Sequence, residues 1–168
     1  MKKLSAVLLL FSLLCLSLLA CAPQTSGGAE KFDFVSPATD AENFVYTPGA
    51  TITALTEAGK AQETLLVPAD AAGIAADVLK TSSALKHFVL GERERPFNFA
   101  NGCFDGTKNL NVYIGCSVDK ATCGGAALLT GATGITFYIV AAQHATFKED
   151  YTWGAVSDQI KKYESAEK

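Results

Sequence analysis

Three stretches of the sequence repeat one short pattern: Val-Leu-Lys-Thr-Ser-Ser-Ala-Leu at residues 78–85, Cys-Phe-Asp-Gly-Thr-Lys-Asn-Leu at 103–110, and Leu-Leu-Thr-Gly-Ala-Thr-Gly-Ile at 128–135. Two apolar positions of the pattern, Leu79/Phe104/Leu129 and Leu85/Leu110/Ile135, recur at the same interval at each step. A β-rich run follows each copy, at residues 87–90, 112–114 and 137–140. A period of about 20 to 50 residues is typical of stacked repeats, in which each unit buries its apolar face against its neighbour.

A weaker fourth copy precedes these three. Residues 62–68, Gln-Glu-Thr-Leu-Leu-Val-Pro, also end in a short apolar strand that is followed by a turn residue. The equivalent strand residues Val67, Leu90, Ile114 and Ile139 follow one another at nearly equal intervals, each one residue longer than the last. The spacing predicts an α/β repeat solenoid, a short stack of about four coils with a parallel sheet on one face. The alternative is an ordinary α/β domain in which the spacings coincide by chance.

The repeat resembles the BspA-like leucine-rich repeats of bacterial surface proteins. The resemblance rests on the pattern Leu85-x-x-Phe88-x-Leu90, with an apolar pair six or seven residues before it, and covers roughly residues 44–160. It implies leucine-rich repeat coils over residues 61–145. It also implies a module without enzymatic activity that binds an extracellular protein or a glycan. The rival hypothesis is a structural, envelope-associated lipoprotein that packs against a partner of its own cell.

Residues 1–20 have the features of an export signal. Lys2 and Lys3 precede an almost unbroken apolar run that is shorter than the 20 or so residues of a membrane-spanning helix. The end of this segment and the residue after it, Leu18-Leu19-Ala20-Cys21, resemble the bacterial lipobox. The resemblance implies that the Cys21 thiol carries diacylglycerol with acyl chains such as palmitate. We therefore expect an exported protein that the lipid on Cys21 anchors to the bacterial cell membrane, facing outside the cytoplasm. The alternative is that Cys21 forms half of a disulfide.

The segments around the repeats have distinct compositions. Residues 21–30, the lipidated cysteine and a small, polar run, predict a flexible tether. Residues 31–60 contain short alternating runs broken by Pro and Gly, which predict an N-terminal β cap of antiparallel strands. Residues 69–80 are rich in alanine and predict a short helix. Residues 146–168 form the C-terminal cap, in which the helical spacing of Ala155, Val156, Ile160 and Tyr163 predicts a helix.

The charge balance argues against several classes of partner. Without Lys2 and Lys3 the chain keeps 12 basic and 17 acidic residues, a net charge of −5. Such a chain has no electrostatic reason to bind nucleic acid or anionic lipid headgroups. Membrane attachment is therefore expected through the lipid alone. The length that remains after the signal suits a single domain, which we expect to be a monomer.

The cysteines and histidines form no catalytic pattern. A cysteine nucleophile needs a base within hydrogen-bond reach, and neither His87 nor His144 stands in register with Cys103, Cys116 or Cys123. A zinc site would use Cys116, Cys123 and His144, whose spacing matches no compact zinc knuckle. No metal, cofactor or enzymatic activity is therefore expected. Because exported proteins meet oxidising surroundings, Cys116 and Cys123 are a candidate disulfide, and Cys103 is expected to be a buried thiol.

The two-residue alternation of the strands separates inward from outward side chains. The inward residues are Leu65, Val67, Phe88, Leu90, Val112, Ile114, Phe137 and Ile139. The outward row, Leu66, Val89, Tyr113 and Tyr138, is the candidate binding face, because an apolar patch with polar handles is typical of interaction sites. The alternative is that the N-terminal segment or the C-terminal helix covers this row. The binding face would then lie on the loops around residues 92–95 and 119–122, although the charged loop 91–96 is also typical of a solvated turn.

Overall fold

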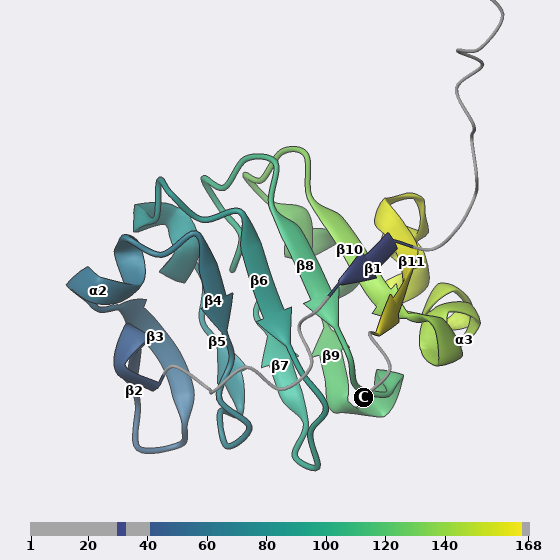
Figure 1. Ribbon diagram of the computed structural model, residues 1–168, viewed down its shortest axis with the longest axis horizontal. Helices are drawn as coiled ribbons and strands as arrows, with labels where there is room; N and C mark the ends of the chain where they lie inside the picture. Colours follow the sequence, from purple (N-terminus) through teal and green to yellow (C-terminus); the bar gives the residue numbers. More distant parts are fainter. Residues whose placement is uncertain (1–29, 33–40, 166–168) are drawn as a thin grey trace, which may run out of the picture.

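The computed structural model describes residues 30–32 and 41–165, which form two mostly parallel β-sheets with few helices (Figure 1). The chain passes alternately from one sheet to the other. Neighbouring strands of the first sheet are β4 (Thr64–Leu66), β6 (His87–Leu90), β8 (Asn111–Ile114) and β10 (Thr136–Val140). Neighbouring strands of the second are β5 (Gly73–Ile74), β7 (Phe97–Phe99) and β9 (Ala121–Cys123). The predicted α/β class and the predicted parallel sheet are confirmed, whereas the sequence did not reveal the second sheet.

The first sheet has six strands in the order β1-β11-β10-β8-β6-β4, with β1 at Glu30–Phe32 and β11 at Ile160–Ser165. All its neighbouring strands are parallel. Leu65 pairs with Phe88, Phe88 with Val112, and Val112 with Phe137, which reproduces the intervals of the sequence pattern. The alignment that the repeat predicted for the strands is therefore confirmed.

The second sheet has five strands in the order β2-β3-β5-β7-β9. β2 (Phe44–Tyr46) and β3 (Thr51–Leu55) form an antiparallel pair, as the sequence predicted for the N-terminal cap. β3 then pairs with β5 in parallel, so the β2–β3 pair continues this sheet at one end. The predicted cap strand at residues 32–35 is not part of this pair, because Phe32 lies in β1 at the edge of the other sheet; residues 33–35 lie outside the described residues.

The described helices are short and join strands. The α-helices are α2 (Glu57–Lys60) and α3 (His144–Glu149). The 3-10 helices are η1 (Ala41–Asn43), η2 (Val78–Thr81), η3 (Val118–Lys120), η4 (Gly125–Leu129), η5 (Ala141–Gln143) and η6 (Trp153–Gln159).

The helix predicted at residues 69–80 is wrong, since this stretch contains β5 and the 3-10 turn η2. Gly73 pairs with Asn98 of β7, and a Cβ at Gly73 would lie 2.7 Å from the Asn98 carbonyl oxygen. The close approach of the two strands therefore outweighs the helical propensity of the alanines.

The prediction of a C-terminal helix is also wrong. η6 is interrupted at Val156, whose φ of −121° is not helical, and the chain continues as β11 beside β10. Residues of both elements are buried, which explains the apolar spacing: Trp153 and Val156 in η6, Ile160 and Tyr163 in β11. Strand pairing with β10 satisfies the backbone of residues 160–163, which a sequence pattern cannot reveal.

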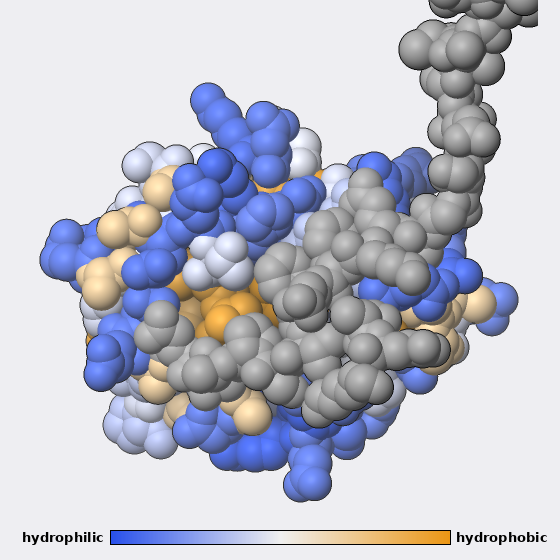
Figure 2. Space-filling model, in the orientation of Figure 1, coloured by the Kyte–Doolittle hydropathy of each residue, from blue (hydrophilic) through white to orange (hydrophobic). Residues whose placement is uncertain are grey.

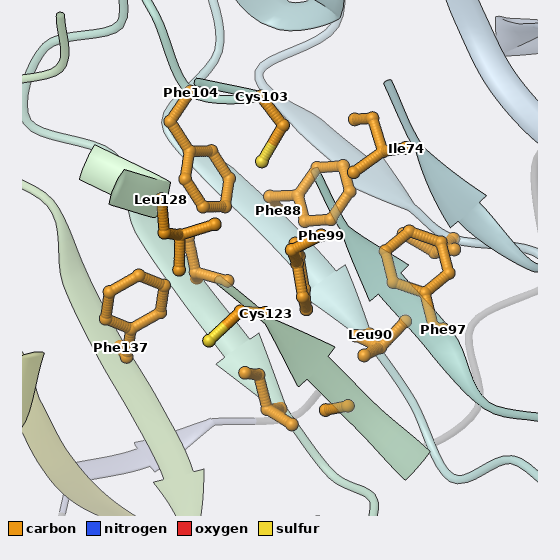
Figure 3. Close-up of a cluster of buried hydrophobic side chains, with 14 of the residues drawn as sticks. Ile74, Phe88, Leu90, Phe97, Phe99, Cys103, Phe104, Cys123, Leu128 and Phe137 are labelled. Carbon is orange, nitrogen blue, oxygen red and sulfur yellow. The ribbon is translucent and has the colours of Figure 1, made fainter. Parts of the chain in front are cut away.

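The core lies between the two sheets and is rich in aromatic rings (Figure 3). Phe88 of the first sheet meets Phe99 of the second edge-on, with ring centroids 6.3 Å apart. The ring centroid of Phe104 lies 6.2 Å from that of Phe88 in β6 and 6.0 Å from that of Phe137 in β10, so this ring connects two strands that flank β8. The eight predicted inward residues are at most 5% exposed, which confirms their orientation. Burying each such side chain contributes about 1.5 to 3 kcal/mol to folding.

Polar contacts outside the core follow the same step along the chain. The Lys80 ammonium lies 2.7 Å from Asp105 Oδ2, 25 residues further on. Arg93 Nη2 donates to the Pro68 carbonyl at 2.7 Å, and Arg95 Nη1 donates to the Asp70 carbonyl at 3.4 Å, again across 25 residues. Equivalent positions of successive segments therefore lie side by side at the surface as well as in the core.

The described residues contain no helix that is long and apolar enough to cross a membrane. The predicted signal peptide, the lipidated Cys21 and nearly all of the tether lie in residues 1–29, outside the described residues.

Candidate functional site

The predicted outward row is aligned as expected. Leu66 pairs with Val89, Val89 with Tyr113, and Tyr113 with Tyr138 on four neighbouring strands. The Tyr113 and Tyr138 rings are stacked, with centroids 5.0 Å apart. The repeat thus brings together residues that are far apart in the sequence.

The row is nevertheless not an exposed face, and this prediction is wrong. Val89, Tyr113 and Tyr138 are only 5%, 1% and 6% exposed, and Leu66 is half-buried. Tyr163 extends the row, because β11 places its ring edge-on to Tyr113 at 5.9 Å. The helical spacing that includes Tyr163 predicts a helix there, so its place in this row could not be expected from the sequence. Among the described residues visible in the same view, Figure 2 shows the most strongly hydrophobic area near the centre, with paler hydrophobic groups toward the edges and hydrophilic side chains between them.

The predicted disulfide is also wrong. Cys103, Cys116 and Cys123 are all free thiols and all buried. Cys116 follows a strand of the first sheet and Cys123 ends a strand of the second, with η3 between them, so the two cysteines belong to different layers. Burial raises the pKa of Cys116 to about 11 and also raises the pKa values of Cys103 and Cys123. These thiols are neutral at physiological pH and poor nucleophiles. Cys103 is buried, as predicted.

The histidines are separated in the fold. His87 begins β6, with its ring 5.8 Å from that of Tyr113, and burial lowers its pKa. His144 begins α3, where burial and then the charges of Lys148 and Lys162 lower its pKa. Within residues 41–165, no three His, Cys, Asp or Glu side chains are grouped closely enough to hold a metal ion.

A cavity of about 530 Å³ lies at the carboxyl ends of β6, β8 and β10. Because these strands are parallel, the segments that follow them meet at one edge of the sheet. Its polar lining comes from all three segments: Glu92, Arg93, Glu94, Cys116, Ser117 and Gln143. The loop around residues 92–95, the alternative binding face expected from the sequence, thus forms one wall of the cavity.

Arg93 is held in place at this wall. Its Nη2 donates to the Pro68 carbonyl, and its guanidinium carbon lies 4.8 Å from the centre of the Phe97 ring. Nε and Nη1 are buried and have no hydrogen-bond partner within the described part of the chain. Burial lowers the pKa of Arg93, but the usual value is so high that the group stays charged.

Tyr163 links the covered row to the cavity. A Cβ at Gly115 would lie 3.3 Å from the Tyr163 hydroxyl oxygen, so the absence of a side chain at Gly115 leaves room for the phenol. Burial, followed by the nearby Cys116 and Glu92, raises the pKa of Tyr163 to about 12. This tyrosine is therefore neutral at physiological pH.

The chemistry of the cavity suits binding. Glu92 and Glu94 are exposed at its rim, and neither forms an ion pair with another described residue. These two carboxylates accept hydrogen bonds, and the Arg93 guanidinium donates them. The Ser117 hydroxyl and the Gln143 amide can do both, so the cavity offers a ligand charged and neutral hydrogen-bonding groups. The Cys116 thiol beside them is protonated, and no histidine is among the lining residues. No protein-family model, curated protein or solved structure matches this chain.

Proposed function

We propose that the chain is a BspA-like leucine-rich repeat solenoid, lipid-anchored at the bacterial cell surface, that binds a protein or a glycan. The fold part of the proposal is supported by the nearly constant parallel step from each inner strand of the first sheet to the next. The second sheet adds steps of nearly the same length, from Gly73 to Asn98 and from Asn98 to Thr122. A chain that returns to the neighbouring position in both sheets at nearly constant intervals has the geometry of a coil.

The binding part rests on one observation, the cavity at the carboxyl ends of β6, β8 and β10. Its walls come from three successive coils of the proposed solenoid, so a ligand there would touch equivalent loops of each. The exposed Glu92 and Glu94 give it hydrogen-bond acceptors that suit the amides of a protein or the hydroxyls of a glycan.

A pull-down tests the binding. Residues 27–168 include every described residue and can be immobilised and exposed to host extracellular proteins, to glycans and to the cell's own envelope fraction. Capture from the first two supports the proposal. Capture only from the envelope fraction favours the rival hypothesis of a structural lipoprotein.

The cavity is tested by removing its rim charges. Glu92→Gln with Glu94→Gln should weaken capture about tenfold, the effect of losing interactions worth about 1.4 kcal/mol. The matched control is Glu42→Gln with Glu57→Gln, which removes two exposed carboxylates at the β2 and α2 end. Equal capture by both variants would place the binding site elsewhere.

The anchor is tested separately. Cys21→Ala should abolish incorporation of labelled palmitate and leave the precursor uncleaved, because the thiol that accepts the lipid is missing. Unlipidated wild-type protein in the aqueous phase of a detergent extraction would contradict the anchor.

A further inference from the structure

The position of β1 fixes where the proposed tether meets the folded part. Glu30, Lys31 and Phe32 pair in parallel with Tyr163, Glu164 and Ser165 of β11. β1 is therefore the outermost strand at one edge of the first sheet, and β4 is the outermost strand at the other. Figure 1 shows β1 beside β11, near α3 and far from α2.

The span available to residues 21–30 is comparable to the distance between the two outermost strands of the first sheet. Nine residue steps join Cys21 to Glu30, which span at most about 30 Å when extended. The average span of such a small, polar linker is about 17 Å. β4 lies five strand spacings from β1, which is about 24 Å further along the stack.

We infer that the end of the molecule formed by β1, β11 and α3 faces the bilayer, with Tyr151 and Lys148 against the lipid headgroups. The inference rests on the proposed lipid anchor at Cys21. The opposite end, with α2 and the β2–β3 pair, then points away from the membrane.

The side chains at this end suit the headgroup region. Tyr151, two residues after the end of α3, is 96% exposed, the most exposed large apolar side chain among the described residues. Tyrosine prefers membrane–water interfaces, where its ring is partly buried and its hydroxyl stays hydrated. Lys148 and Lys162 are exposed, and both act on His144, which places them on the same part of the surface. Lysine stems cover apolar surface while the ammonium groups stay among the phosphates.

Acidic side chains are also present at this end of the molecule. Their presence determines which lipid headgroups the surface suits. Glu149 and Asp158 are exposed, and Glu164 lies 3.6 Å from Lys162. A surface with both signs suits zwitterionic headgroups better than anionic ones. The membrane for the test is therefore phosphatidylcholine.

The experiment compares two reporters on the full, lipidated, mature protein in phosphatidylcholine vesicles. One variant carries Tyr151→Cys and the other Glu57→Cys, each labelled with a thiol-reactive fluorophore. Glu57 lies in α2, and its side chain is 91% exposed. The native thiols at 103, 116 and 123 are buried, and the unsubstituted protein measures any labelling of them. Lipids with a nitroxide on the headgroup then quench whichever reporter lies near the bilayer.

Quenching at position 151 should exceed quenching at position 57 at least about twofold, because the two ends differ in distance from the anchor by more than the average tether span. Equal quenching on protein that floats with the vesicles, or stronger quenching at 57, would overturn the inference and leave the anchor intact. Protein that does not float would overturn the anchor itself and the inference with it.

Discussion

The indole Nε1 of Trp153 donates a hydrogen bond to the main-chain carbonyl of Ala121 at 2.6 Å, across 32 residues of sequence and within the core. Ala121 begins β9, the outermost strand of the second sheet. Trp153 is fully buried and packs against Phe99, Phe137 and Phe147. The segment after α3 thus closes the end of the core with one large side chain.

Trp153→Phe should lower the free energy of unfolding by about 1 to 3 kcal/mol, because the Ala121 carbonyl loses its buried donor and the ring loses volume. Trp153→Ala should cost about 3 to 5 kcal/mol. Urea unfolding followed by circular dichroism measures both values. Tyr151→Ala, at a 96% exposed position, is the control and should change stability by less than about 0.5 kcal/mol.

Tyr113→Ser should destabilise the protein by about 3 kcal/mol, since it removes a buried ring that stacks on Tyr138 and meets Tyr163 edge-on. Tyr151→Ser makes the same chemical change at an exposed site and should leave the melting temperature nearly unchanged. Thermal unfolding of the two variants gives the comparison. Similar melting temperatures would show that Tyr113 is accessible and would restore the outward row as a binding face.

Gly131→Ala should cost about 1 to 3 kcal/mol. Gly131 has a φ of +71°, and a Cβ there would run into the Asp105 carboxylate of the preceding segment. Gly91→Ala is the matched control, because no atom lies within 4 Å of the Cβ position at Gly91. Chemical denaturation should show a much larger loss of unfolding free energy for Gly131→Ala than for Gly91→Ala. Equal tolerance would mean that the two segments do not approach this closely.

The Lys80–Asp105 contact should make the stability of the protein fall at acidic pH. Its hydrogen bond from Lys80, the largest cause, holds the pKa of Asp105 below the ordinary value of 3.8. A lowered carboxyl pKa gives stability that is fully present above the ordinary value and is lost as the pH falls through the folded-state pKa. The wild-type melting temperature should therefore fall more between about pH 5 and pH 2 than that of Asp105→Asn. Asp158→Asn, at an exposed site without an ion pair to any described residue, should follow the wild type.

The three described cysteines should be thiols that react only after unfolding, in protein cleaved before Cys21 and lipidated there as proposed. Cys103, Cys116 and Cys123 are buried and free, and burial raises the pKa of each. Counting with a chromogenic disulfide reagent, in denaturant and without reductant, should give three groups per chain. A count of one would show that two of them are bridged.

The sequence predicted the strands that the repeat contains. It did not predict the second sheet or β11, which are determined by contacts between distant parts of the chain. The strands at residues 87–90, 112–114 and 137–140 lie at or within one residue of β6, β8 and β10, because each side chain of a repeat meets its equivalent. The second sheet was missed because β5 has only two residues and β7 and β9 have three each, too few for a two-residue alternation to be recognised. The place of β11 was missed because its apolar residues satisfy a helical spacing equally well.

The candidate site shows the same division. The alignment of Tyr113 with Tyr138 follows from the period. The ring that packs edge-on against Tyr113 belongs to Tyr163 of the later strand β11, where the pattern is no longer present. The cavity forms because three loops follow parallel strands, an arrangement that the composition of the charged loop around Arg93 does not reveal. Its one available signal was the pair of glutamates that flank an arginine, a pattern that solvated turns share.

The parallel register also determines how such a chain can change length. Each inner strand of the first sheet meets its neighbours at equivalent positions, so removing residues 87–110 would bring β8 into the place of β6, and β9 into the place of β7, without shifting any pair. Removing a single residue from a strand would instead turn every following side chain to the opposite face. Strand register is therefore preserved when a full segment is duplicated or deleted, or when a residue is added between strands, as the successive offsets of 23, 24 and 25 residues show. The number of segments can change in this way while both ends of the stack stay the same.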